Sequence, residues 1–327
     1  VATWERYGPS VQKLLCDRVS KRTPAIAVEE IDCKIIFDHE NGNHRHRNVK
    51  TGSECVVRMT PEVLVDDWCV FTVMVDVSEV TKLDLRGTWA NTYGVLKDRD
   101  TQELAKIMND CKSLRILQLG TDLTDTFGAA LGNAVATHTT LVHLVIHNNN
   151  FGDETGVALG KALTTNTSLH TLDLGGNSLR DKGGASIIRG LRNNTTLRVL
   201  NLDRNGLGES FGVASQGDLA NNTGLRALYL GFNNLRDTSG VAIAKALTVN
   251  TTLKHLYLKG NYLGEESGAA LVDALIQNST LTKLDVRGNN AISFATQAKI
   301  KFALSPELKG LLNTPSVSPS RISVCVV

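Results

Sequence analysis

The cysteines and histidines of this sequence are its most obvious candidates for metal binding or nucleophilic chemistry. Cys33 or Cys55 could bind a zinc ion together with His39, His44 and His46, because thiolate and imidazole groups are preferred zinc ligands. Their spacing matches no known zinc motif, and the six cysteines include no C-x-x-C pair. A chain of this length does not need disulfides to fold. We therefore expect reduced thiols, solvated histidines, no metal site and no cofactor, in a cytoplasmic protein.

Sequence motifs of common enzymes offer no alternative chemistry. The chain has no phosphate-binding G-x-x-x-x-G-K-S/T loop, no H-E-x-x-H zinc motif and no EF-hand calcium loop. Its glycines recur at fixed positions of a repeat, and its acidic residues are scattered. We therefore expect no enzymatic activity and no catalytic residue.

The composition excludes several classes of protein. The 327 residues are 42% apolar and 21% charged, with a formal net charge of +2, which excludes wholesale disorder. The most apolar stretch, Val70–Val77, has the length of a strand, whereas a membrane span needs roughly 18 uninterrupted apolar residues. A net charge near zero argues against a dedicated polyanion-binding protein. We expect neither a membrane nor a sequence-specific nucleic acid as a partner.

An internal repeat organises the second part of the chain. The pattern L-x-x-L-x-L-x-x-N-x-L recurs every 28 residues and begins at Leu141, Leu169, Leu197, Leu225, Leu253 and Leu281. Two degenerate copies begin at Leu114 and Val80, and the second contains an insertion around Trp89 to Asp100. Eight copies exceed the roughly three that a repeat protein needs to bury a continuous core.

Each repeat predicts a short strand followed by a turn. The apolar residues of the L-x-L segment alternate with period two, so both should point into the core of a parallel sheet. The asparagine that follows can hydrogen-bond to the backbone of its own turn and of the neighbouring turn. We therefore expect Asn149 to Asn289 to form a ladder along one edge of the sheet.

The rest of each repeat predicts a helix. Gly156 and its counterparts are followed by small residues, which should let the helix approach the strand layer closely. A second asparagine ends each helix, as at Asn166 and Asn250, where it could adopt the left-handed conformation. Helices are about 10 Å wide and strands are spaced about half that, so the stack must curve. The fold class is an α/β solenoid, a horseshoe with a concave parallel sheet and convex helices.

This repeat resembles the ribonuclease-inhibitor type of leucine-rich repeat over residues 80–305. The resemblance implies the solenoid fold and leaves function open, because one fold supports many functions. Ribonuclease inhibitors are also rich in cysteine and strongly acidic, and this chain is neither.

The two ends carry no repeat. We expect residues 1–79 to be an N-terminal region that caps the open edge of the first strand, and residues 306–327 to be an irregular tail. In the N-terminal region we predict a helix over Trp4–Val19, an exposed loop over His39–Gly52, and a helix that begins at Thr60 and continues through Val63–Val77. Ser293–Leu304 should complete the last helix.

The residues that flank the buried strand leucines should face outward on the concave side. Tyr229, Tyr257 and His255 would form an aromatic patch there, next to acidic and basic groups. Tyrosine and arginine are enriched where proteins bind one another. We predict a protein-binding surface made of His143, His147, Asp173, Asp203, Tyr229, His255, Tyr257, Lys259 and Arg287. Partners would be other proteins, bound by this surface or by the N-terminal region.

Two more specific resemblances suggest a function. Residues 138–152 and the first-repeat insertion are similar to Ran GTPase-activating proteins, but Val95 stands where that family has its catalytic arginine. Valine cannot stabilise phosphoryl-transfer charge, so this activity is only the alternative hypothesis. The insertion and the stretch from Arg99 to Leu114 resemble the leucine-rich-repeat subunit of the nexin–dynein regulatory complex of cilia and flagella. That resemblance implies a structural scaffold in an axoneme.

Overall fold

The computed structural model describes a repeat solenoid and several strands that precede it. The described residues are 33–36, 43–48, 54–58, 60–65, 68–72, 81–85, 101–120 and 122–305. The predicted helix Trp4–Val19, the insertion that contains Val95, and the predicted tail 306–327 lie outside them.

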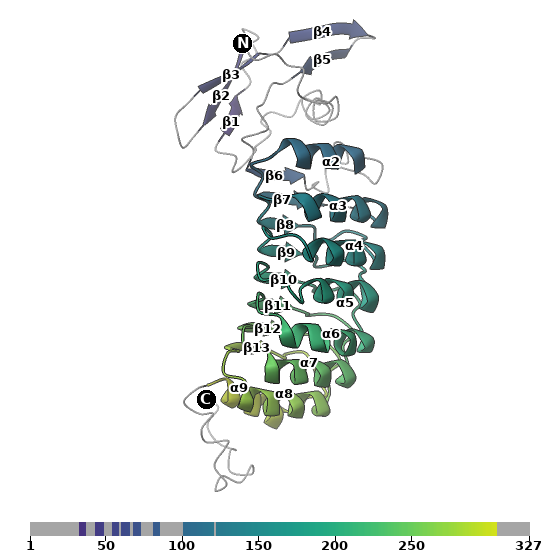
Figure 1. Cartoon of the computed structure of the whole chain (residues 1–327), viewed down its shortest axis with the longest axis vertical. Helices are drawn as coiled ribbons and strands as arrows, with labels where there is room; N and C mark the ends of the chain where they lie inside the picture. The colour runs from purple at the N-terminus through teal and green to yellow at the C-terminus, as the bar shows by residue number, and fades with distance from the viewer. Residues whose placement is uncertain are drawn as a thin grey trace.

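One sheet of eight parallel strands runs the length of the solenoid, with each strand paired only to its neighbours in the sequence. The strands are β6 (Lys82–Leu85), β7 (Ile116–Leu119), β8 (His143–Val145), β9 (Thr171–Asp173), β10 (Val199–Asn201), β11 (Ala227–Tyr229), β12 (His255–Tyr257) and β13 (Lys283–Asp285). Figure 1 shows these strands along the inner side of a shallow arc, as the repeat predicted.

The helices form the outer layer of the same arc (Figure 1). They are α2 (Thr101–Asp110), α3 (Asp125–Thr137), α4 (Asp153–Leu163), α5 (Arg180–Gly190), α6 (Glu209–Asn221), α7 (Asp237–Val249), α8 (Glu265–Gln277) and α9 (Phe294–Leu304). The core lies between the two layers. Leu200 and Leu202 of one repeat are fully buried there, and Leu200 is in register with Leu172 and Leu228 of the neighbouring strands.

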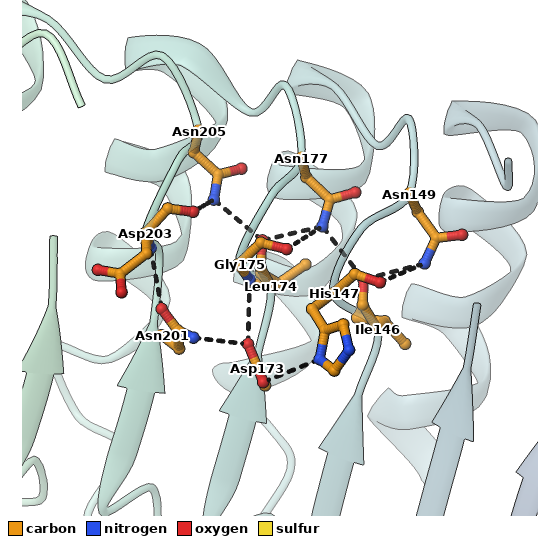
Figure 2. Close-up of polar contacts among 10 residues, drawn as sticks. All are labelled: Ile146, His147, Asn149, Asp173, Leu174, Gly175, Asn177, Asn201, Asp203 and Asn205. Carbon is orange, nitrogen blue, oxygen red and sulfur yellow. Dashed lines mark hydrogen bonds and ion pairs between the residues drawn. The ribbon is translucent and has the colours of Figure 1, made fainter. Parts of the chain in front are cut away.

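The asparagine that follows each strand forms the predicted ladder. The side-chain amide of Asn177 donates to the carbonyl oxygen of Leu174 in its own repeat (2.8 Å) and of Ile146 in the preceding repeat (3.1 Å) (Figure 2). Its side-chain oxygen accepts from the backbone amide of Phe151 (3.1 Å). Asn205, Asn233, Asn261 and Asn289 repeat the donation to the preceding copy.

The asparagine that ends each helix forms a second ladder, but its predicted left-handed conformation is wrong. Asn250 has φ −67° and ψ 124°, an extended backbone that leads directly toward the next strand. Its side-chain amide donates to the carbonyl oxygen of Leu219 (2.7 Å) and its side-chain oxygen accepts from the amide of Leu253 (2.8 Å). Asparagine is needed here because its amide joins two repeats, and the chain must leave the helix in an extended conformation.

The helical glycines allow close contact between successive helices, whereas the close approach of the following small residues to the strand layer stays a prediction. A Cβ atom at Gly156 would collide with the backbone of Gly183 in α5, and one at Gly212 would collide with Ser239 in α7. The width of a helix, not its distance from the sheet, limits how tightly successive repeats can stack. Glycine at this position reduces that width.

Before the solenoid, the structure shows strands where we predicted a loop and a helix. β1 (Cys33–Ile36), β2 (Asn43–Asn48) and β3 (Glu54–Arg58) form one antiparallel sheet, so the predicted loop His39–Gly52 is wrong where it overlaps β2. β4 (Thr60–Val65) and β5 (Trp68–Thr72) form a separate hairpin in place of the predicted helix from Thr60. The β-branched and aromatic residues of this segment favour a strand, and they outweigh the helix-start signal at Thr60. Capping of the solenoid by this region stays a prediction.

Candidate protein-binding surface

The outward-facing residues of the parallel sheet lie in three rows because every strand pairs in register with the next. The first row contains His143, Thr171, Val199, Ala227, His255 and Lys283. The second contains Val145, Asp173, Asn201, Tyr229, Tyr257 and Asp285. The third, just beyond the strands, contains His147, Gly175, Asp203, Gly231, Lys259 and Arg287. All nine predicted site residues lie in these rows, which we call the sheet face.

A chain of hydrogen bonds joins the middle of the sheet face (Figure 2). His147 Nδ1 lies 3.2 Å from one carboxylate oxygen of Asp173. The other oxygen accepts from the side-chain amide of Asn201 (2.8 Å) and from the backbone amide of Gly175 (3.0 Å). Both oxygens of Asp173 therefore have partners, and its side chain is held in one orientation.

Asp203 continues this chain on the next repeat. Its backbone amide donates to the side-chain oxygen of Asn201 (2.9 Å), and its carboxylate accepts from the amide of Gly231 (2.6 Å). Burial raises the pKa of Asp203 above its usual value, and the nearby carboxylate of Asp173 adds to the effect. The middle of the sheet face is thus acidic and rigid.

Tyr229 and Tyr257, two of the three residues of the predicted aromatic patch, stack on one another, and we call this pair the tyrosine stack. Their ring centroids are 4.3 Å apart and the ring planes differ by 4°. The ammonium group of Lys283 lies 5.1 Å from the Tyr257 centroid, within the range of a cation–π contact. Burial, and then the neighbouring Tyr257, raise the pKa of the Tyr229 hydroxyl. The stack presents a flat aromatic surface next to a positive charge.

The basic end of the sheet face has fewer unpaired cations than the sequence suggested. Arg287 donates from Nε to one carboxylate oxygen of Asp285 (2.9 Å) and from Nη2 to the other (2.6 Å). These hydrogen bonds from Arg287 hold the pKa of Asp285 below its usual value. Lys259 and Lys283 form no ion pair within the part of the chain that the structure describes. They carry the positive charge of this end.

His143 lies apart from the tyrosine stack, because β8 and β11 are separated by two strands. Burial lowers the pKa of His143, and the nearby His170 and Arg115 lower it further. His255 is closer, on the same strand as Tyr257 and in register with Lys283. The nine predicted residues thus form one continuous face, with the aromatic and basic groups gathered at the C-terminal half.

Sequence reasoning missed a repeat position at the rim of the sheet, just after the third row. Its residues have positive φ in successive repeats: Asn148 (54°), Gly176 (68°), Arg204 (54°), Phe232 (55°), Gly260 (67°) and Gly288 (73°). A left-handed conformation costs an ordinary residue roughly 1–2 kcal/mol relative to glycine. The signal was available, since aligning the repeats places a phenylalanine where three copies have glycine.

Phe232 is held between residues of the two neighbouring repeats. The guanidinium carbon of Arg204 lies 4.3 Å from its ring centroid, and the ammonium nitrogen of Lys259 lies 5.3 Å from it. On the Lys259 side the ring covers Gly260, where an added Cβ would come within 2.7 Å of ring carbon Cδ1. Phe232 is nevertheless 42% exposed. We call Arg204, Phe232 and Lys259 the Phe232 clamp.

Other places on the described surface offer less for chemistry. A hollow of 230 Å³ lies between α2 and α3 and another of 340 Å³ lies on α6, α7 and α8, both in the helix layer. The letters G-x-S-x-G of serine hydrolases do occur, at Gly208 to Gly212. The structure places Ser210 in the first turn of α6, where its backbone amide donates to Asp181 (3.2 Å). Serine hydrolases also place this motif at a helix start, but within the described residues no histidine hydrogen-bonds to the Ser210 hydroxyl.

Comparison with known proteins identifies the repeat. A family model described as leucine-rich repeat matches residues 165–187, 193–210, 221–244, 249–272 and 277–293. Between residues 165 and 293 the solenoid is built of leucine-rich repeats. This confirms the predicted fold class. No curated protein matches the sequence.

Several solved structures are similar to part of the chain. Leiomodin-1 actin-binding site 2 has 17% sequence identity and a TM-score of 0.42, over 49% of this chain and 90% of that one. The C-terminal domain of tropomodulin from Caenorhabditis elegans has 14% identity and a TM-score of 0.38, over 49% and 93%. An internalin from Listeria monocytogenes has 17% identity and a TM-score of 0.32, over 55% and 56%.

Within the described residues, no helix is long and apolar enough to cross a lipid bilayer. The same residues contain no group of three or more histidine, cysteine or acidic side chains that could hold a metal ion. The hypothetical zinc ligands fall outside this statement, because the structure gives only the backbone register that pairs His46 with Cys55.

Proposed function

We propose that this chain is a non-enzymatic scaffold that binds another protein on the sheet face. The tyrosine stack is the observation that supports this best. Two parallel tyrosine rings are displayed on a rigid sheet, with Lys283 at one side and the acidic Asp173 and Asp203 at the other. Aromatic groups surrounded by mixed charges are typical of the residues that dominate protein–protein binding.

The polar chain on the sheet face supports a binding role rather than catalysis. His147 and Asp173 have the arrangement of a base and its orienting acid. Among the described residues, no serine, threonine or cysteine side chain hydrogen-bonds to either of them. Without a nucleophile, the pair acts to fix the shape and charge of the surface.

Crosslinking in cells tests the proposal. A photoreactive group on the sheet face should capture a protein partner, and a Tyr229→Thr/Tyr257→Thr double variant should lose most of that capture. Threonine keeps the strand conformation, so the fold should survive. Tyr262→Thr is the matched control, because Tyr262 is 67% exposed but lies outside the three rows. Equal capture by the parent and the double variant would contradict the proposal.

For the biological setting, we propose a cytoplasmic structural complex, with the axoneme of cilia or flagella as the specific hypothesis. Its support is the sequence resemblance of the first-repeat insertion and the stretch that ends at Leu114. Native purification from ciliated cells should then recover the chain in a large assembly. Recovery as a free monomer would count against it.

Activation of a Ran-type GTPase is the alternative function. The resemblance of residues 138–152 favours it, and Val95 at the position of the catalytic arginine opposes it. A GTP turnover assay separates the two functions, with Arg86→Ala and Arg99→Ala testing whether another arginine substitutes. Absence of stimulation by the parent chain would end this alternative.

A further inference from the structure

The Phe232 clamp has a feature that packing alone does not explain. Phe232 adopts a conformation that favours glycine, and three other repeats have glycine at this position. Burial does not offset that strain, because Phe232 remains 42% exposed. Strained residues that persist in folded proteins cluster where ligands bind. The chain therefore holds an aromatic ring outward at a specific point on the rim.

The charges around the ring indicate what would bind there. Arg204 and Lys259 are exposed, and in the described part of the chain neither forms an ion pair. The carboxylate of Asp203, next to Arg204 in the chain, accepts instead from the amide of Gly231. Two cations that form no ion pair, on either side of an exposed ring, are complementary to carboxylates placed beside an apolar group.

We propose that the Phe232 clamp is the anchor for an acidic segment of the partner protein, in which carboxylates flank an apolar side chain. This inference rests on the proposed function and names the partner's chemistry. The apolar side chain packs on the Phe232 ring, and the carboxylates bind Arg204 and Lys259. The segment then reaches the tyrosine stack, since Tyr229 and Phe232 belong to the same repeat.

A single-stranded nucleic acid is the competing occupant, because aromatic rings and cations also bind bases and phosphates. The acidic groups of the sheet face argue against it. Asp173 and Asp203 occupy neighbouring places along the polar chain, and Asp285 neutralises Arg287. A phosphate backbone laid along the rows would be repelled at each of these carboxylates.

Fluorescence anisotropy with short synthetic peptides tests the anchor. The probe is a labelled peptide rich in glutamate with two leucines at its centre. One control peptide has glutamine in place of glutamate, and another has serine in place of leucine. We expect the parent chain to bind the probe at least about tenfold more tightly than either control at low salt. Equal binding of the glutamine peptide, or tighter binding of oligothymidylate, would overturn the proposal.

Variants at the clamp make the test specific. Phe232→Gly removes the ring and suits the left-handed backbone, so the fold is preserved while probe affinity falls about tenfold. Asn148→Gly is the matched control, at the same repeat position but away from the clamp, and should leave affinity unchanged. Unchanged affinity of Phe232→Gly would refute the anchor.

An Arg204→Gln/Lys259→Gln double variant tests the two cations of the clamp while Phe232 and its backbone stay unchanged. Both side chains are exposed, so the fold should persist, and probe binding should weaken about tenfold and lose most of its salt dependence. A salt dependence equal to that of the parent would refute the anchor. Failure here is distinguishable from failure of the proposed function. If a cellular partner is captured through the tyrosine stack but the clamp variants bind the probe as tightly as the parent, only the anchor is refuted. If the probe binds but no cellular partner is captured, the scaffold function is refuted.

Discussion

Asp237 in the first turn of α7 accepts hydrogen bonds from both the backbone amide (3.0 Å) and the hydroxyl (2.6 Å) of Ser267 in α8. It also accepts from the amide of Gly264 (2.8 Å). Asp125 makes the same contacts with Gly152 and Thr155 at the start of α4. An acidic residue of one repeat thus satisfies the free amides at the start of the next helix, which no side chain of that helix does.

Replacing Asp237 with asparagine should destabilise the protein by about 1 kcal/mol at neutral pH, because charge-assisted hydrogen bonds are lost. Burial opposes the charged form, but the donors of Ser267 and Gly264 outweigh it and lower the pKa of Asp237. Its contribution is therefore present above the usual aspartate pKa and is lost as the pH falls through the lowered folded-state value. Urea denaturation at several pH values should show the parent and the variant converging below about pH 4. Asp273→Asn, at an exposed site on α8, should show no such convergence.

Leu202→Ala should cost roughly 2–5 kcal/mol of unfolding free energy, because Leu202 is fully buried between the sheet and the helices. Chemical denaturation measures the change. Val213→Ala provides the comparison, since Val213 is 57% exposed on α6 and should change stability little. Similar midpoints for the parent and Leu202→Ala would mean that the leucine core is not packed as described.

Asn233→Asp tests the ladder with a side chain of the same size that cannot donate. The amide of Asn233 donates to the carbonyl oxygens of Leu202 (2.9 Å) and Leu230 (3.0 Å). The carbonyl of Leu202 loses its donor in the variant, at about 1–3 kcal/mol, whereas that of Leu230 keeps the amide of Asn261. Thermal unfolding should therefore begin at a clearly lower temperature. A melting curve identical to that of the parent would show that water replaces the ladder without cost.

Two substitutions of Phe232 separate backbone strain from ring contacts. Both Phe232→Ala and Phe232→Gly lose the ring, but only glycine adopts positive φ without cost. We expect the glycine variant to be more stable than the alanine variant by about 1 kcal/mol. The reverse order in urea denaturation would contradict a left-handed backbone at this position.

The thiol of Cys111 should be unreactive in the folded protein. Burial, reinforced by the nearby Asp110, raises its pKa to about 11, and the thiolate is the form that reacts. At pH 8, alkylation of the folded parent and of Cys111→Ser should reach the same extent. After unfolding, the parent should label at one additional thiol. Rapid loss of that thiol under native conditions would show that α2 opens readily.

Features repeated in every copy could be predicted from the sequence. Leu200 and Asn177 occupy positions whose chemistry is the same in each repeat, so their burial and hydrogen bonding followed from the pattern. The backbone conformation of Asn250 was harder to predict. The left-handed preference of asparagine is general, whereas the conformation of Asn250 depends on where the next strand begins. The helix expected at Thr60 failed for a similar reason, since strand pairing overrode a local signal.

Features of the candidate site that depend on one copy were harder to predict. The pairing of Arg287 with Asp285 follows from their places two residues apart on the same face of the sheet, where Arg287 lies just beyond β13, and a residue-by-residue reading overlooks it. The role of Phe232 depends on backbone geometry at a turn. Hydrophobic patterning carries no information on that backbone geometry, and only an alignment of the repeats, in which glycine recurs at this position, indicates it.

Because the strands pair in register, equivalent residues of this surface recur at a fixed spacing. Adjacent strands are about 4.8 Å apart, whereas an extended peptide advances about 3.3 Å per residue. Three residues of a peptide laid across the strands therefore span about the same length as two repeats. A ligand that follows the rows would meet equivalent positions of alternate repeats with every third side chain, so the sequence of a true partner should carry that periodicity.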